Sequence, residues 1–263
     1  MLNNENYKLY NGDCLEVMDK LIMEGLKVDA VICDPPYGTT VCKWDSIIPL
    51  DEMWNRVNNL IKDNSAIVLF GNEPFSSKLR MSNIKNYKYD WIWKKNKAQG
   101  FLNSKKMPLK DYENICVFYE KLPIYNPQGV IKIDKLMKNT GTKNNKGIKK
   151  NGDITSANCS IKNTHYKQEF TNYPRQIITF NNSENNKLHP TQKPVDLLEY
   201  LINTYTEEND LVLDFTMGSG STGVACLNTN RRFVGIELDE TYFNIAKDRI
   251  ENSILTGKQK RLF

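Results

Sequence analysis

The chain has 263 residues and a net charge of +5, and 40% of its residues are hydrophobic and 25% charged. This composition is ordinary for a globular protein with one sizeable core. No apolar run approaches the roughly 18 residues of a membrane span, and the amino terminus does not resemble a signal peptide, so we expect a cytoplasmic protein that does not associate with membranes.

The first 120 residues alternate predicted strands and helices. A turn at Asn11-Gly12 opens a segment whose apolar residues recur at helical spacing. Uninterrupted apolar runs at 28–34 and 65–72 predict two buried strands with a helix between them, and 89–95 and 113–120 predict two more. Continuous rather than alternating strands, separated by helices, indicate a mainly parallel sheet that is covered on both faces.

The composition changes between residues 121 and 187. This stretch holds 12 Lys or Arg against 4 Asp or Glu, and 12 asparagines. Its net charge is therefore +8, which leaves −3 for the rest of the chain. We interpret it as an insertion outside the main sheet, with ordered pieces near Ile131 and around 173–180. Such a basic segment suits a polyanionic partner, although a solvated lysine-rich loop explains the charge equally well.

Regular structure is predicted again after His189. Pro194 is well placed at a helix start, and the apolar residues of 197–205 fall on one face of that helix. A buried strand at 210–217, a glycine-rich turn, a strand at 233–239 and a final amphipathic helix follow. The six cysteines are scattered and only two histidines occur, so a metal site is not indicated.

The glycine-rich turn reads Gly218-Ser-Gly220-Ser-Thr-Gly223 and lies between a predicted strand and a predicted helix. That is the context in which a G-x-G-x-x-G motif binds a nucleotide. Glu237 ends the next strand, where a carboxylate can accept hydrogen bonds from both ribose hydroxyls. These features predict a cofactor that contains adenosine, without saying which one.

A second motif, Asp34-Pro35-Pro36-Tyr37, follows an apolar strand, at the edge where doubly wound sheets bind ligands. Methylation of an aromatic amine requires the NH2 group to be held by two hydrogen-bond acceptors. The Asp34 carboxylate can be one, and a main-chain carbonyl fixed by the prolines the other. Tyr37 offers a flat face for stacking a base that has left the duplex. A proline-rich turn with a capping aspartate is the simpler interpretation of this motif alone.

Together the two motifs resemble those of amino-group DNA methyltransferases of bacterial restriction–modification systems and phages, in the beta-class order with the catalytic motif first. The resemblance covers residues 7–120 and 188–251. It implies an α/β fold, a doubly wound sheet of the S-adenosylmethionine-dependent methyltransferase type in permuted order, with an inserted target-recognition region. It divides the chain into a catalytic half (1–120), a target-recognition insertion (121–187) and a cofactor-binding half (188–263).

The resemblance also implies roles for individual residues. Asp34, Pro35, Pro36 and Tyr37 match the catalytic motif, and Asp34 borders the cofactor as well. The residues that match cofactor-binding positions are Asp13, Cys14, Lys193, Asp214, Phe215, Thr216, Gly218, Gly220 and Glu237. Asp13 and Cys14 match the segment that contacts adenine, and Lys193 in His189-Pro-Thr-Gln-Lys193-Pro194 is expected to pair with the cofactor's carboxylate.

One departure from the family loop concerns its aromatic residue. The loop usually reads Asp-Pro-Phe-x-Gly-x-Gly, whereas this chain has Asp214-Phe215-Thr216-Met217-Gly218. The phenylalanine thus stands one place early. The backbone cradle should survive, but which side chain packs against the cofactor stays open.

The expected partner is double-stranded DNA. In the insertion, lysines could neutralise phosphates, whereas Arg175, Gln176 and some asparagines suit the reading of base edges. The candidate lysines are Lys132, Lys135, Lys143, Lys149 and Lys150. A cognate restriction endonuclease and a homodimer are further possibilities that the resemblance suggests.

The leading hypothesis is N6-adenine methylation, because the catalytic motif begins with Asp, which the resemblance associates with adenine, where Ser would indicate N4-cytosine. N4-cytosine methylation remains an alternative. So do a nicotinamide-dependent oxidoreductase that uses the glycine turn, and a non-catalytic DNA-binding protein on the same fold.

Overall fold

The computed structural model describes residues 2–3, 5–38, 46–138, 165–181 and 192–260. These residues form two compact units: one contains 1–126 and 175–263, and the other contains 127–174. Within the described ranges, no helix is long and apolar enough to cross a membrane.

The larger unit is built on one nine-stranded sheet with the order β1-β2-β11-β10-β3-β4-β6-β5-β9. Strands β2, β11, β10, β3 and β4 are parallel to one another, β6 is antiparallel to both β4 and β5, and β9 is parallel to β5. Short β1 is antiparallel to β2. The strands are β1 (Leu2–Asn3), β2 (Tyr7–Asn11), β3 (Val28–Cys33), β4 (Ile61–Gly71), β5 (Tyr87–Gln99), β6 (Lys110–Phe118), β9 (Ile177–Phe180), β10 (Leu211–Asp214) and β11 (Arg232–Glu237). The predicted mainly parallel sheet is confirmed.

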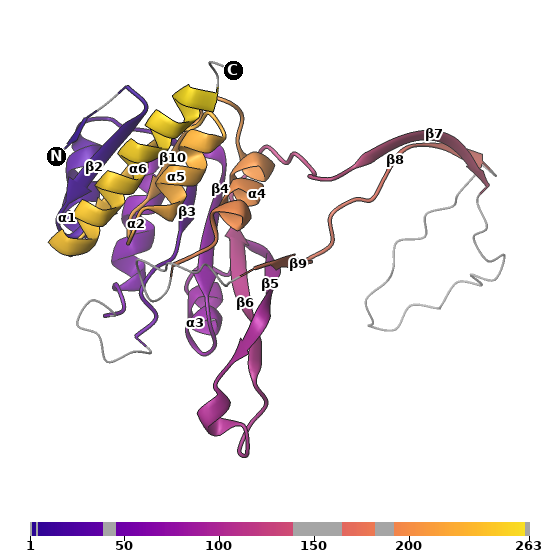
Figure 1. Ribbon diagram of the computed structural model, residues 1–263, viewed down its shortest axis with the longest axis horizontal. Coiled ribbons are helices and arrows are strands. Elements are labelled where there is room, and N and C mark those ends of the chain that lie inside the picture. Colours follow the sequence, from indigo (N-terminus) through magenta and orange to yellow (C-terminus); the bar gives the residue numbers. More distant parts are fainter. Residues whose placement is uncertain (1, 4, 39–45, 139–164, 182–191, 261–263) are drawn as a thin grey trace. The chain divides into compact units, whose positions relative to one another are not determined.

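Among the described residues, six helices cover the two faces of this sheet. One face carries α1 (Cys14–Met23), α2 (Leu50–Leu60) and α3 (Phe75–Ser82), and the other carries α4 (Val195–Tyr205), α5 (Ser221–Asn228) and α6 (Glu240–Lys260). Figure 1 shows α4, α5 and α6 in front of the sheet. Successive residues of β3 alternate between the two faces: Ile32 packs with the cluster under α4 to α6, and Val31 with that under α1 and α2. This doubly wound arrangement is also as predicted.

The centre of the sheet contains a topological switch point. From β10 the chain continues through α5 to β11 on one side, and from β3 through α2 to β4 on the other side. Adjacent strands whose connections diverge leave a crevice at their carboxyl ends, where open α/β sheets bind ligands. Both sequence motifs follow these two strands, so the permuted order still brings them to one place.

The smaller unit contains a two-stranded antiparallel sheet of β7 (Ile131–Lys138) and β8 (His165–Thr171). Both strands lie within the predicted insertion. Strand β9 falls in the same sequence range, 121–187, but it belongs to the main sheet, where Ile177 is in register with Ile92.

Candidate active site

A cleft of about 380 Å³ opens at the carboxyl ends of the parallel strands. Five segments distant in sequence line it: 12–15, 34–37, 46–49, 215–219 and 237–238. Lys193 lines it from the segment before α4. Both sequence motifs therefore border one cavity, whose size lies in the range of about 300–1,000 Å³ typical of small-molecule sites.

The turn between β10 and α5 is shaped by two glycines. Gly218 and Gly220 have φ angles of 52° and 78°, in the left-handed region that other residues rarely adopt. At Gly220 a Cβ would lie 2.9 Å from the Cβ of Ala246, so a side chain there would also collide with α6. The turn is thus closed tightly, and the main chain of Gly218 faces the cleft without a side chain in the way.

Glu237 ends β11 at the rim of this turn. Its carboxylate accepts hydrogen bonds from the main-chain N–H groups of Gly218, at 2.8 Å, and Asp239, at 2.9 Å. Burial raises the pKa of this carboxyl above its usual value. Each carboxylate oxygen has a second acceptor site, so Glu237 can still accept hydroxyl donors from a ligand in the cleft.

Asp214 and Thr216 connect the glycine turn to the other motif. The Thr216 Oγ1 donates to the main-chain oxygen of Asp34 at 3.0 Å and lies 3.0 Å from the Cys33 Sγ. Asp214 accepts from the Thr216 N–H at 3.1 Å, and burial raises the pKa of Asp214 to about 6. Phe215 is only 1% exposed and belongs to the core cluster under α1 and α2. The position that is aromatic in the loop of the resembled family is therefore a threonine that holds the segment at Asp34.

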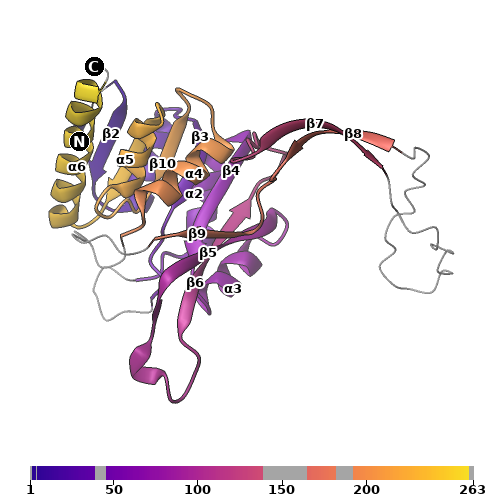
Figure 2. The same ribbon diagram turned by 45° about the vertical axis from the view of Figure 1, so that its right-hand side comes forward.

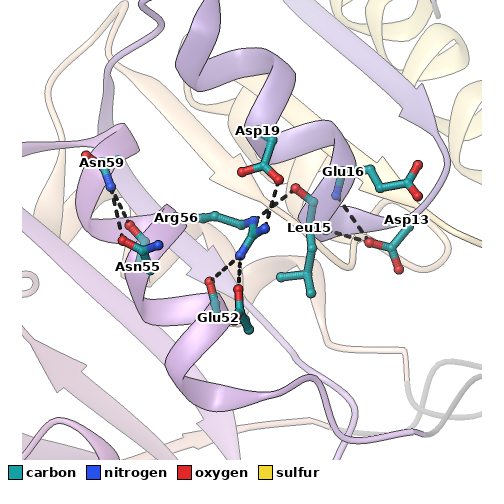
Figure 3. A network of polar contacts seen from close by, with 8 residues as sticks. All are labelled: Asp13, Leu15, Glu16, Asp19, Glu52, Asn55, Arg56 and Asn59. Carbon is teal, nitrogen blue, oxygen red and sulfur yellow. Dashed lines mark hydrogen bonds and ion pairs between the residues drawn. The ribbon is translucent and has the colours of Figure 1, made fainter.

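The start of α1 borders the cleft next to Glu237. Asp13 caps this helix by accepting from the N–H groups of Leu15, at 2.8 Å, and Glu16 (Figure 3). Arg56 of α2 donates to the Leu15 carbonyl and pairs with Asp19 at 2.8 Å, which fastens the first turns of α1 to α2. Asp13 and Cys14, predicted to contact the cofactor, both line the cleft on this fixed turn.

A buried ionic cluster, which we define as Asp34, Glu113, Lys95 and Lys193, lies beside the other end of the cleft. The Lys193 Nζ is 2.5 Å from the Asp34 Oδ2 and 3.1 Å from the Glu113 Oε1. The Lys95 Nζ lies 2.7 Å from the Glu113 Oε2. The Tyr37 hydroxyl donates to the Asp34 carboxylate and is 2.8 Å from the Glu113 Oε1. Two carboxylates and two ammonium groups thus balance in charge; Glu113, Lys95 and Lys193 are almost fully buried, and Asp34 is partly exposed to the cleft.

The charges of this cluster shift its pKa values. Burial raises the pKa of Asp34, although Lys193 opposes the effect. For Glu113 burial acts in the same direction, but the two ammonium groups outweigh it and lower the pKa to about 2. Burial would lower the pKa of Lys193, yet its two carboxylate partners raise it above the ordinary value. Lys193 is therefore held as a cation and Glu113 as an anion.

The cluster includes Lys193, whose ammonium we expected to pair with the carboxylate of the cofactor; that pairing stays a prediction. In the structure the ammonium contacts Asp34 of the Asp-Pro-Pro-Tyr motif and Glu113. Glu113 and Lys95 did not emerge from the sequence. The available signal was a glutamate at the start of the buried run of β6, where only a paired charge is tolerated.

Several further residues line the cleft without having been predicted, and some predicted ones are not described. Gln192, Met217, Leu238 and Tyr242 border the cavity. Lys143, Lys149, Lys150 and the stretch His189–Thr191 lie outside the described residues.

The residues of the cleft fit S-adenosylmethionine. The glycine turn leaves room for close backbone approach, Glu237 presents a carboxylate for the ribose hydroxyls, and the segment at Asp34 supplies acceptors near the place where a methyl group would be delivered. A parallel sheet with its switch point beside such a cleft, and a carboxylate at the end of the next strand, is typical of folds that bind a cofactor containing adenosine. The class of S-adenosylmethionine-dependent methyltransferases has these features, and here the Asp-Pro-Pro-Tyr motif borders the same cleft.

Comparison with known proteins leads to the same class of enzyme. The chain belongs to the N6/N4 DNA methylase family, whose model matches residues 28–248. It is 26% identical over 252 residues to the type II methyltransferase M1.MboII of Moraxella bovis, which covers 91% of this chain and 94% of that protein. The crystal structure of an M1.HpyAVI complex with S-adenosylmethionine matches with a TM-score of 0.64 and 28% identity, over 93% of this chain and 98% of the other.

A third match concerns the fold alone. The cytosine-N4-specific PvuII DNA methyltransferase has a TM-score of 0.62 at 18% identity, with 94% of this chain and 87% of that one covered. The chain is thus a site-specific DNA methyltransferase that uses S-adenosylmethionine and acts on an exocyclic amino group, adenine N6 or cytosine N4. Family membership decides against the nicotinamide-dependent alternative.

Proposed function

We propose that this enzyme methylates N6 of an adenine that has been flipped out of double-stranded DNA. The observation that carries the proposal is the carboxylate of Asp34, which borders the cleft as the first residue of the Asp-Pro-Pro-Tyr motif. In this family, Asp at the first position of the motif is associated with adenine, whereas Ser is associated with cytosine N4.

Asp34 is the first of the two acceptors that the amino group needs. Its Oδ1 accepts from Tyr37 and its Oδ2 from Lys193, and each oxygen keeps another acceptor site for the target NH2. The second acceptor is a main-chain carbonyl of the segment that Pro35 and Pro36 stiffen. Two such hydrogen bonds direct the nitrogen lone pair toward the cleft. The nitrogen then has a proton to release, and Asp34, whose pKa burial raises, is the carboxylate placed to accept it.

Tyr37 is proposed to contact the target base. Its ring stacks on that of Phe75, with centroids 5.2 Å apart and 29° between the planes. Its hydroxyl is held by Asp34 and Glu113, so the ring has a fixed orientation. A fixed aromatic face costs little entropy when a base stacks against it, and offsets part of the few kcal/mol that flipping costs.

The rest of the cleft is proposed to hold S-adenosylmethionine, which supplies the methyl group. Glu237 accepts the ribose hydroxyls, while Asp13 and Cys14 border the adenine. The turn that contains Gly218 and Gly220 approaches the remainder of the cofactor with its main chain. Asp214 and Thr216 hold that turn in place, and Phe215 supports it from the core.

The organisation of the chain remains part of the proposal. Residues 1–120 supply the catalytic half, 188–263 the cofactor-binding half and 121–187 the target-recognition region. Within that region Lys132 and Lys135 contact phosphates. A cognate restriction endonuclease and a homodimer are proposed from the family alone, and sedimentation of the purified protein tests the dimer.

The decisive experiment is nucleoside mass spectrometry of unmethylated DNA that has been incubated with the enzyme and S-adenosylmethionine. N6-methyladenine is expected, and N4-methylcytosine in its place would overturn the proposal. The Asp34→Ala variant tests the role of the clamp: it should lose turnover and still bind S-adenosylmethionine in calorimetry. Undiminished methylation by this variant would refute the role of Asp34, whichever base is the target.

A further inference from the structure

The β5–β6 hairpin extends beyond the carboxyl edge of the parallel sheet. Gly71, the last residue of β4, is in register with Asn114 of β6. The hairpin therefore continues past the end of its neighbour, to Gln99 on one strand and Lys110 on the other (Figures 1 and 2). Six residues separate Trp93, beside Glu113, from Gln99, so at about 3.3 Å per residue the hairpin reaches roughly 20 Å past the cluster.

The end of this hairpin, residues 96–110, is named here the hairpin tip. It presents large apolar side chains to solvent at the 3-10 turn Phe101–Asn103 and after it. Phe101 is 78% exposed, Leu102 is fully exposed, and Met107 is 58% exposed. Side chains of this size gathered on one protruding turn form an apolar projection of the kind that marks an interaction site.

Lysines surround this apolar projection. Lys94, Lys97, Lys105 and Lys106 are exposed, and Asp111 is the one acidic residue between positions 94 and 112. Exposed apolar side chains that are flanked in sequence by exposed lysines suit a partner that combines stacked aromatic bases with phosphates. Lysines neutralise the phosphates, and apolar side chains wedge between base steps or fill the space of an extruded base.

The tip lies where the DNA substrate must be. The cleft with Asp34 opens at the carboxyl edge of the sheet, which is also the edge from which the hairpin projects. The base of the hairpin carries Lys95 and Glu113 of the buried ionic cluster, so the tip and the active site share two strands. A reach of roughly 20 Å exceeds the depth of about 8 Å of either groove of DNA.

We propose that the hairpin tip is a second DNA-contacting element, separate from the insertion. In this arrangement Lys105 and Lys106 bind phosphates near the target site. Phe101 and Leu102 enter the duplex and stabilise the distortion that accompanies extrusion of the base.

The test compares two tip variants with two matched controls. Phe101→Ala with Leu102→Ala removes the apolar projection, and Lys105→Gln with Lys106→Gln removes charge. The controls are Met23→Ala with Ile84→Ala, and Lys20→Gln with Lys85→Gln, which change equally exposed side chains at the opposite edge of the sheet. All these residues are exposed, so each variant should keep the unfolding temperature of the parent protein.

Methylation of unmethylated genomic DNA, amplified in vitro, is followed with tritiated S-adenosylmethionine over a range of salt concentrations. The apolar tip variant should lose roughly tenfold in kcat/KM for DNA, the effect of one lost stacking contact, while the KM for S-adenosylmethionine is unchanged. The lysine variant should reduce the slope of log affinity against log salt by about 1.8, since each phosphate contact contributes about 0.9. The controls should match the parent protein.

The proposal is overturned if the tip variants match the parent in kcat/KM for DNA and in the salt slope. It is equally overturned if they lower the sedimented mass while DNA affinity is unchanged, because the tip would then contact a second copy of this chain. Neither outcome bears on which base is methylated, so the inference and the adenine assignment fail separately.

Discussion

Glu113→Gln is the perturbation whose effect the structure defines most closely. The carboxylate of Glu113 is buried, pairs with Lys95 at 2.7 Å and with Lys193 at 3.1 Å, and lies 2.8 Å from the hydroxyl of Tyr37. Glutamine has the same shape but no charge, and it therefore mimics the protonated carboxyl. Lys193 then keeps only the carboxylate of Asp34, and Lys95 loses the carboxylate with which it pairs.

Burial opposes ionisation of Glu113, but Lys193 and Lys95 outweigh it and lower the pKa to about 2, so the charged form stabilises the folded protein at pH 7. Removing one partner of a buried ion pair costs about 3–5 kcal/mol of the free energy of unfolding. For a chain of this size the variant should unfold roughly 6–20 °C lower than the parent.

The direction of this pKa shift determines how the stability contribution of Glu113 changes with pH. A carboxyl whose folded pKa is lowered contributes stability above its unfolded pKa of 4.5, and this stability is lost as the pH falls toward about 2. The difference between parent and variant should therefore be full at pH 7 and less than half as large at pH 3. Urea unfolding at both pH values measures it. Equal stability at pH 7, or a difference that does not shrink in acid, would refute the reasoning.

The same variant has a second effect that lost packing alone would not produce. The charge of Glu113 raises the pKa of Asp34. Without it, the Asp34 carboxyl should ionise at lower pH, and the acid limb of the profile of kcat/KM against pH should move to lower pH. An acid limb that stays in place would show that Asp34 does not limit activity there.

Three other predictions follow from the cleft. Glu237→Gln should weaken S-adenosylmethionine binding roughly 10- to 100-fold in calorimetry, because hydrogen bonds to a charged carboxylate are lost; an unchanged Kd contradicts its role. Gly220→Ala should lower the unfolding temperature more than Gly25→Ala, because both have positive φ but only Gly220 lies against α6. Thr216→Val should lower kcat about tenfold with an unchanged cofactor Kd, and Thr216→Ser should restore it, since the Oγ1 holds the catalytic segment.

Much of the fold follows from local rules that can be read along the chain. Uninterrupted apolar runs separated by amphipathic helices imply a covered parallel sheet, and the structure has one. Gly218 and Gly220 are needed where φ is positive, and the helix before residue 206 starts after Pro194. These features depend on neighbouring residues, so short stretches of sequence are sufficient to predict them.

The placement of β9 could not be predicted in the same way. The segment around Ile177 follows a basic, asparagine-rich stretch and reads as part of the insertion. In the structure it pairs with β5, because Trp93 and its neighbours leave one edge of that strand available for a parallel partner. Edge pairing depends on which strand lies alongside, and that information is spread over the whole fold.

The sequence was sufficient to predict the Asp34 motif and its hydrogen-bond acceptors, because Asp, Pro and Tyr are adjacent in the chain. It was not sufficient to predict which side chains contact Asp34. Lys193 is 159 residues away and Thr216 is 182 residues away. Thr216 reaches Asp34 because β3 and β10 are neighbours at the switch point, and Lys193 reaches it because α4, which follows it, packs on the face of the sheet that includes Ile32 of β3. Glu113 joins them because β6 folds back along β4. The charges that set the pKa of Asp34 are therefore a property of the tertiary structure, since electrostatic interactions act over distance in space and not along the chain.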